Sequence, residues 1–191
     1  VIRCDLEIAR EPRCSLFAQV PRYPLAYEPV SWLQRLLDDP LASYNSPQQY
    51  MAAKMILNTA RDVVVILPTG TGKSLLAMLS AASRPERTTV IVSPLISLKG
   101  DIVRRVGRLG LSVHDALEGF TGQSILVLTP ELAISNPGEA LLRRLAYKDS
   151  LNRIFIDEVH LAVTDGHFRP IFSGLPKLGA HGVPLILMTA T

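Results

Sequence analysis

Short apolar runs alternate with segments of helical periodicity along most of the chain. The runs are rich in Val, Ile and Leu, which is typical of strands buried in a sheet. Between them, apolar residues recur every three to four positions, which is typical of helices with one buried face. The pattern predicts strands at 63–67, 88–92, 125–128, 153–156 and 185–188, and helices at 31–39, 48–58, 73–83, 98–109 and 139–147.

This order of elements predicts an α/β fold, in which one parallel sheet is flanked by helices. The first 30 residues do not follow the pattern and contain Pro12, Pro21, Pro24 and Pro29, so we expect an N-terminal extension or linker there. The domain itself is predicted to occupy residues 31–191. Because the chain begins with Val and ends directly after an apolar run, we expect it to be part of a longer protein, cut before a second domain.

Composition narrows the class of protein. The chain has 191 residues, 48% hydrophobic and 19% charged, which is enough for one well-packed domain and excludes a disordered chain. The net charge of +3 is compatible with a nucleic-acid partner without requiring one. No apolar run approaches the roughly 18 residues of a membrane helix, so we expect no membrane-spanning helix and no membrane partner. Cys4 and Cys14 lack zinc-site spacing and are expected to be reduced thiols of an intracellular protein, nuclear in a eukaryote.

A glycine-rich loop joins the strand 63–67 to the helix 73–83 and reads Pro68-Thr69-Gly70-Thr71-Gly72-Lys73-Ser74. Glycines let successive backbone N–H groups point to one place, and the helix start adds a positive dipole end. Lys73 is expected to contact the β- and γ-phosphates of ATP, and Ser74 to bind Mg²⁺. The strict phosphate-loop pattern has Gly where this chain has Leu67.

An acidic pair follows the strand 153–156. Asp157 stands at the carboxyl end of that strand, where parallel sheets place ligand-binding residues. We expect Asp157 to hold the Mg²⁺ shell and Glu158 to act as general base on the attacking water. With Lys73, these two acids form the predicted catalytic set of a P-loop NTPase.

The order of the motifs resembles that of superfamily 2 helicases, and within them the RecQ group of DEAH type. The resemblance covers residues 31–191, and its runs are Pro-Thr-Gly-Thr-Gly-Lys-Ser, Ser-Pro-Leu-Ile-Ser-Leu at 93–98, Thr-Pro-Glu at 129–131, Asp-Glu-Val-His at 157–160, His-Phe-Arg-Pro at 167–170 and Thr-Ala-Thr at 189–191. The runs at 46–49 and 182–185 are similar to RecQ-like helicases encoded near fungal telomeres. The family implies a RecA-like first domain that uses ATP and Mg²⁺.

The resemblance also implies binding roles for residues outside the phosphate loop. Gln48 would read the adenine edge, with Tyr44 stacking beside it. Residues along the path of single-stranded DNA would be Ser93, Pro94, Leu95, Lys99, Thr129, Pro130 and Glu131, with Arg104 adding charge. Solvated charges on a helix face are the alternative for Lys99 and Arg104.

A further set of residues would couple hydrolysis to movement on DNA. The family places this role on His160, Phe168, Arg169, Thr189 and Thr191. The coupling loop of RecQ proteins usually carries a Trp, whereas the sole Trp here is Trp32. We therefore expect weak base stacking by this loop.

The function implied is that of an ATP-dependent 3′–5′ DNA helicase acting on single-stranded or partly duplex DNA in repair or recombination. Two alternatives remain, an RNA helicase of the same superfamily and a catalytically incomplete remnant that only binds nucleotide and nucleic acid. A helicase hydrolyses ATP between two RecA-like domains, and the second supplies an arginine finger. On its own, this chain is therefore expected to bind ATP weakly and to be nearly inactive.

Overall fold

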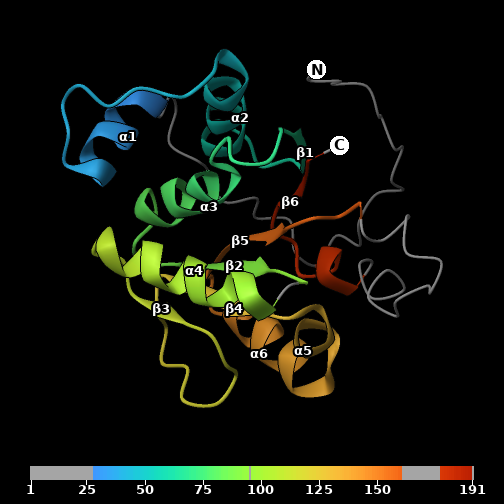
Figure 1. The fold of residues 1–191 in the computed structure, drawn as a ribbon. Coiled ribbons are helices and arrows are strands. Elements are labelled where there is room, and N and C mark those ends of the chain that lie inside the picture. Colours follow the sequence, from blue (N-terminus) through green and yellow to red (C-terminus); the bar gives the residue numbers. More distant parts are fainter. Residues whose placement is uncertain (1–27, 95, 161–176, 191) are drawn as a thin grey trace.

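The computed structural model describes residues 28–94, 96–160 and 177–190, without side-chain placement at 96–99. Its strands form one sheet that is parallel throughout, in the order β1-β6-β5-β2-β4-β3 (Figure 1). The strands are β1 (Val63–Ile66), β2 (Thr88–Val92), β3 (Val113–His114), β4 (Ile125–Leu128), β5 (Leu151–Ile156) and β6 (Leu185–Thr189). The predicted α/β class is therefore confirmed.

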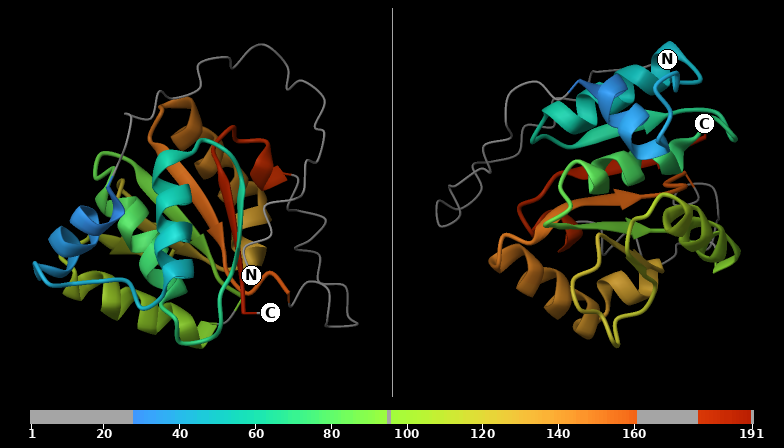
Figure 2. Two further views of the ribbon diagram at one scale, coloured as in Figure 1. Left: turned by 90° about the horizontal axis from the view of Figure 1, so that it is seen from above. Right: turned by 90° about the vertical axis from the view of Figure 1, so that its left-hand side faces the viewer.

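Helices cover both faces of the sheet (Figure 2). The first four contribute to one hydrophobic cluster and the last two to another. They are α1 (Pro29–Leu37), α2 (Pro47–Asn58), α3 (Lys73–Ala82), α4 (Ile96–Arg108), α5 (Pro130–Ile134) and α6 (Asn136–Tyr147). None of the helices in the described ranges is both long and apolar enough to cross a bilayer.

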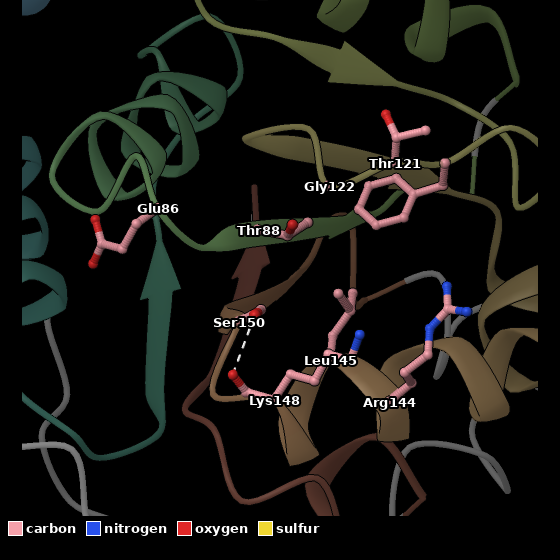
Figure 3. A pocket seen from close by; sticks show the side chains of 9 residues that line it. Glu86, Thr88, Thr121, Gly122, Arg144, Leu145, Lys148 and Ser150 are labelled. Atoms are coloured by element: carbon pink, nitrogen blue, oxygen red, sulfur yellow. Dashed lines mark hydrogen bonds between the residues drawn. The ribbon is translucent and has the colours of Figure 1, made fainter.

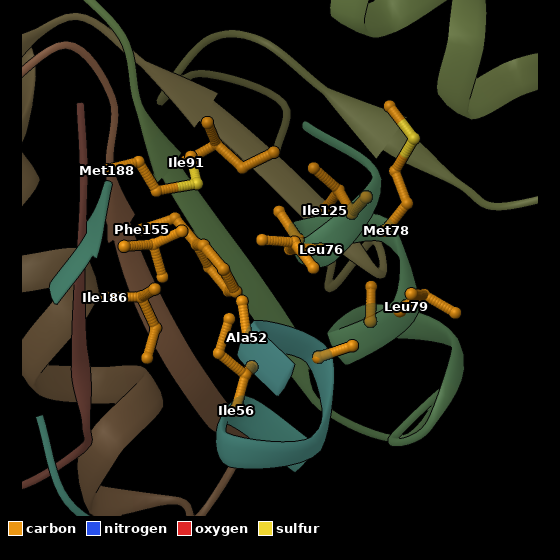
Figure 4. Close-up of a cluster of buried hydrophobic side chains, with 14 of the residues drawn as sticks. Ala52, Ile56, Leu76, Met78, Leu79, Ile91, Ile125, Phe155, Ile186 and Met188 are labelled. Carbon is orange, nitrogen blue, oxygen red and sulfur yellow. The ribbon is translucent and has the colours of Figure 1, made fainter. Parts of the chain in front are cut away.

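Alternating side chains of the central strands fill the two clusters. Ile91 and Phe155 face the cluster under α2 and α3 (Figure 4), whereas their neighbours Val90 and Ile154 face the cluster under α6. All four side chains are buried, at 0–2% exposure. Because side chains alternate across a strand, apolar residues at every position mark a strand covered on both faces.

Local capping accounts for where several elements differ from the prediction. The first helix begins at Pro29 because Glu28, rather than Ser31, caps it, so α1 reaches into the region predicted as an extension. Ser46 caps α2 by accepting from the backbone N–H of Gln49 at 3.1 Å.

The sequence pattern missed β3 and α5, which are only two and five residues long. Such short segments are too brief to show a period.

Strand β5 begins at Leu151, two residues before its predicted start. The apolar pattern did not reveal this, because the strand buries polar residues as well as apolar ones. The amide of Asn152 donates to the backbone oxygen of Ser80 and to the hydroxyl oxygen of Thr89, both at 3.0 Å. Arg153 is 2% exposed and donates to the backbone oxygen of Thr59 at 2.9 Å. These bonds satisfy polar groups in the core and tie β5 to β2 and α3.

Replacing Asn152 by Ala should lower the free energy of unfolding by about 1–3 kcal/mol, since it leaves buried acceptors without their donor. Urea denaturation followed by circular dichroism measures the change. Asn58→Ala is the control, because Asn58 makes an exposed bond to the backbone of Lys54, and it should change stability by less than about 0.5 kcal/mol. Equal losses in the two variants would contradict the role assigned to the buried amide.

Candidate functional site

The glycine-rich loop connects β1 to α3 and folds back on itself. Gly70 and Gly72 have φ angles of 76° and 82°, in the left-handed region that favours glycine. The hydroxyl of Thr71 donates to the backbone oxygen of Pro68 at 2.6 Å. Gly72 caps α3 and has no side chain that could accept a hydrogen bond from the first N–H groups of the helix. Such a helix start attracts anions.

The ammonium of Lys73 lies against this loop. It donates to the backbone oxygen of Leu67 at 3.0 Å and is 4.0 Å from Glu158 Oε1. The residue is only 9% exposed. Ser74, the next residue of α3, is half-buried. Lys73 thus links the loop to the end of β5.

The acidic pair directly follows β5. The backbone N–H of Asp157 donates to Val92 of β2 at 2.9 Å, and the backbone N–H of Glu158 donates to Asp157 Oδ1 at 3.0 Å. Glu158 has a φ of 49°, a left-handed conformation that is strained for a residue with a side chain. Burial, followed by the neighbouring Glu158 carboxylate, raises the pKa of Asp157. The hydrogen bond from the Glu158 backbone N–H and the charge of Lys73 lower this pKa by less.

The imidazole of His160 lies between the acidic pair and β6. Its Nδ1 is 3.2 Å from Glu158 Oε2 and 3.0 Å from the hydroxyl of Thr189. Two residues of the predicted coupling set, His160 and Thr189, are therefore in contact. The other three, Phe168, Arg169 and Thr191, lie outside the described residues.

The glutamine that faces the loop is one position further along than predicted. Gln48 is exposed, so the structure does not bring it to the loop. Gln49 is fully buried, and its amide donates to the backbone oxygen of Gly72 at 3.4 Å and accepts from the N–H of Asn45 at 2.8 Å. A Cβ on Gly72 would lie 2.7 Å from Gln49 Nε2, so a side chain at this position would displace the Gln49 amide. Position on the helix separates the two glutamines, because consecutive residues point about 100° apart.

Tyr44 contacts the first helix. Its hydroxyl donates to the backbone oxygen of Pro29 at 2.8 Å, and its ring meets Tyr50 edge-on, with centroids 5.7 Å apart. Burial raises the pKa of Tyr44 well above its ordinary value. These contacts join α1 to α2, and stacking of Tyr44 on a nucleotide stays a prediction.

The structure also alters the expected nucleic-acid contacts at the end of β2. Ser93 is fully buried, and its backbone N–H donates to Leu128 at 3.0 Å, so its side chain is not on the surface as a phosphate contact requires. Strand pairing explains this, because Ser93 continues β2 between its two neighbours. Pro94 is half-buried. Leu95 and the side chain of Lys99 lie outside the described part of the chain.

The second predicted contact motif forms the start of α5. Thr129 caps this helix by accepting from Leu132 N–H at 3.3 Å, and Pro130 is buried as its first residue. Glu131 is exposed. Arg104 of α4 is exposed and paired with Asp101 at 3.1 Å. Thr129 thus has a capping role, while Glu131 and Arg104 are accessible on the surface.

Comparison with known proteins matches residues 46–191 to the DEAD/DEAH box helicase family. The chain is 32% identical over 169 residues to ATP-dependent DNA helicase Q5 of Mus musculus, covering 78% of this chain and 17% of that protein. It is 37% identical to ATP-dependent DNA helicase Q-like 2 of Arabidopsis thaliana, covering 72% and 23%. The ATP-dependent DNA helicase RecQ of Synechocystis is 35% identical, covering 69% and 31%.

The chain thus spans less than a third of the length of each of these three relatives. The matched segment, residues 46–191, contains both the phosphate loop and the acidic pair that follows β5. This chain belongs to the DEAD/DEAH box helicase family.

Proposed function

We propose that the chain is the ATP-binding, first RecA-like domain of a RecQ-type DNA helicase. The observation that carries this proposal is the approach of Lys73 Nζ to Glu158 Oε1, at 4.0 Å, beside Asp157. A cation from the loop and two carboxylates from β5 meet where a magnesium nucleotide would need them. The proposed domain occupies residues 31–191.

The residues fit a magnesium nucleotide. Positive φ angles at Gly70 and Gly72 and an α3 start without a side-chain cap leave backbone N–H groups for phosphate oxygens. Ser74 and Asp157 would hold Mg²⁺. The described residues contain no group of three or more His, Cys, Asp or Glu side chains that could cage a metal. Mg²⁺ usually keeps its waters and takes few protein oxygens, so a cage is not required.

The chemistry follows from these positions. Bound Mg²⁺ would neutralise charge on the β- and γ-phosphates. Lys73 would exchange its bond to the Leu67 oxygen for a phosphate oxygen, and Glu158 would accept a proton from the attacking water. His160 contacts both Glu158 and Thr189, so it would pass a change at the acid to β6. Gln49, rather than Gln48, would read adenine beside the loop.

The partners proposed are single-stranded or partly duplex DNA and a second RecA-like domain that supplies an arginine finger. Translocation from 3′ to 5′, a nuclear location in a eukaryote, and roles in DNA repair or recombination belong to the same proposal. The similar proteins named DNA helicases favour DNA over RNA. Alone, this chain should hydrolyse ATP slowly, because it would lack the arginine finger.

Lys73→Ala should weaken Mg-ATP binding at least tenfold, because a charge-assisted hydrogen bond of about 1.5–3 kcal/mol is lost. Titration calorimetry with and without single-stranded DNA measures it. Lys54→Ala, which removes an exposed lysine of α2, is the matched control and should bind normally. Equal affinity in Lys73→Ala and wild type would refute the proposed site.

Asp157→Asn should raise the Tm of the nucleotide-free protein at neutral pH. The folded-state pKa of Asp157 is raised, so ionisation opposes folding above that pKa and the penalty disappears as pH falls through it. Thermal melts from pH 7 downwards, without Mg²⁺, should show the gain shrinking with acidity. The same variant should lose stabilisation by Mg-ATP. A Tm gain independent of pH would argue against this cause.

Gln49→Ala should lower ATP affinity and the preference for ATP over GTP, because its amide is proposed to read adenine. Gln48→Ala should change neither, since Gln48 is exposed on α2. Competition between ATP and GTP for a fluorescent nucleotide measures the ratio. A general loss of folding would lower both affinities together, so an unchanged ratio in Gln49→Ala would contradict the assignment.

A further inference from the structure

A pocket of about 400 Å³ lies at the amino-terminal edge of the sheet (Figure 3). Thr88 is the first residue of β2, Ser150 directly precedes β5, and Thr121 lies in the segment leading to β4. In a parallel sheet this edge is opposite to the one that carries the phosphate loop. None of the residues of the proposed nucleotide site lines the pocket, so it is a separate feature.

Two cations come from one wall of this pocket. Arg144 and Lys148 are four positions apart at the end of α6, and both are exposed. Both residues line the pocket together with Thr88, and the side chain of Arg144 extends upward from α6 in Figure 3. Within the described ranges neither side chain forms an ion pair, whereas Arg143 on the same helix is paired with Glu139 at 2.6 Å. The charges of Arg144 and Lys148 are therefore available to an anion.

An aromatic ring accompanies these charges. Tyr147 is 86% exposed, and on a helix the positions of Arg144, Tyr147 and Lys148 share one face. Phe120 also lines the pocket and is partly buried against the hydrophobic cluster under α6. Cations for phosphate together with accessible rings for bases are the features by which proteins hold single-stranded nucleic acid.

The acidic residue that lines the pocket does not oppose the binding of an anion there. Glu86 is the acidic residue of the lining, and its Oε1 lies 3.9 Å from the guanidinium of Arg87, which also pairs with Asp149. The hydroxyl of Thr121 accepts from Gln123 at 3.0 Å, so its own proton can point to a ligand. The pocket thus keeps an excess of positive charge and hydrogen-bond donors.

We propose that this pocket and the adjoining exposed face of α6 bind one nucleotide unit, with its phosphate on Arg144 and Lys148 in the pocket and its base against Tyr147, which lies outside the lining. The unit comes either from an extended strand or from a free nucleotide, which offer the same chemistry. The proposal goes beyond the proposed function, because the residues predicted to contact nucleic acid follow β2 and β4 at the opposite, carboxyl edge of the sheet. A volume near 400 Å³ is within the range of small-ligand sites.

The test uses a short oligothymidylate that carries 4-thiothymidine for photocrosslinking, without ATP. Crosslinks should map to Tyr147 or Phe120, and excess thymidine monophosphate should displace them if a free nucleotide is the ligand. Arg144→Ala/Lys148→Ala should reduce the slope of log affinity against log salt by about 0.7, the value for one neutralised phosphate on a single strand. Arg143→Ala/Lys177→Ala removes two cations that contact Glu139 and should retain the slope.

The aromatic part is tested separately. Tyr147→Ala should weaken strand binding about fivefold or more, and Tyr147→Phe should restore it. An unchanged salt slope in Arg144→Ala/Lys148→Ala, or crosslinks confined to the carboxyl edge, would overturn the proposal. So would equal competition by an oligoglutamate peptide with no effect of Tyr147→Ala, which would identify an acidic protein segment as the ligand.

The outcome is independent of the proposed ATP site. Arg144→Ala/Lys148→Ala should bind Mg-ATP like wild type, and Lys73→Ala should retain the crosslinks at Tyr147. Failure of the Lys73 prediction would refute the proposed ATP site without changing these crosslinks. Loss of thermal stability alone, without a change in salt slope, would show that the two cations only stabilise the end of α6 and would refute the inference.

Discussion

The parallel direction of every described strand is the constraint on which the site depends. Because all carboxyl ends reach one edge, β1 delivers the phosphate loop and β5 delivers the acidic pair to the same place, although β6 lies between them. The result is the approach of Lys73 to Glu158 at 4.0 Å. The buried bonds of Asn152 hold β5 against β2 and α3, the helix that begins at Lys73. A shift of either element would separate the cation from the carboxylates.

The carboxyl edge of the sheet also contains features that oppose folding. Glu158 adopts a left-handed conformation, and burial together with its neighbour raises the pKa of Asp157. Both features oppose folding in the absence of a ligand, whereas both suit a site that receives a cation. Strain and unfavourable ionisation of this kind are often found at functional sites. If the proposed function is correct, the stability of the empty domain and its binding of a magnesium nucleotide would therefore compete at Asp157.

The two edges of the sheet differ in how their charged residues are arranged. At the carboxyl edge, backbone N–H groups, Lys73 and two acids lie close together and are largely buried. At the amino edge, Arg144 and Lys148 are exposed beside Tyr147, around an open pocket. The first arrangement suits a compact ion with fixed geometry, and the second suits a flexible, repeated anion.

The sequence by itself determined the fold class, the order along the chain of every described strand except β3, and the local composition of the loop and the acidic pair. These depend on neighbouring residues, because glycine freedom, apolar runs and helix starts act over a few positions. Only the tertiary structure decided which of two adjacent glutamines meets the loop, that the side chain of Ser93 is buried, and that Asn152 and Arg153 belong to a core strand. Each of these depends on what packs against the residue from a distant element, such as Gly72 against Gln49. Periodicity does not contain that information.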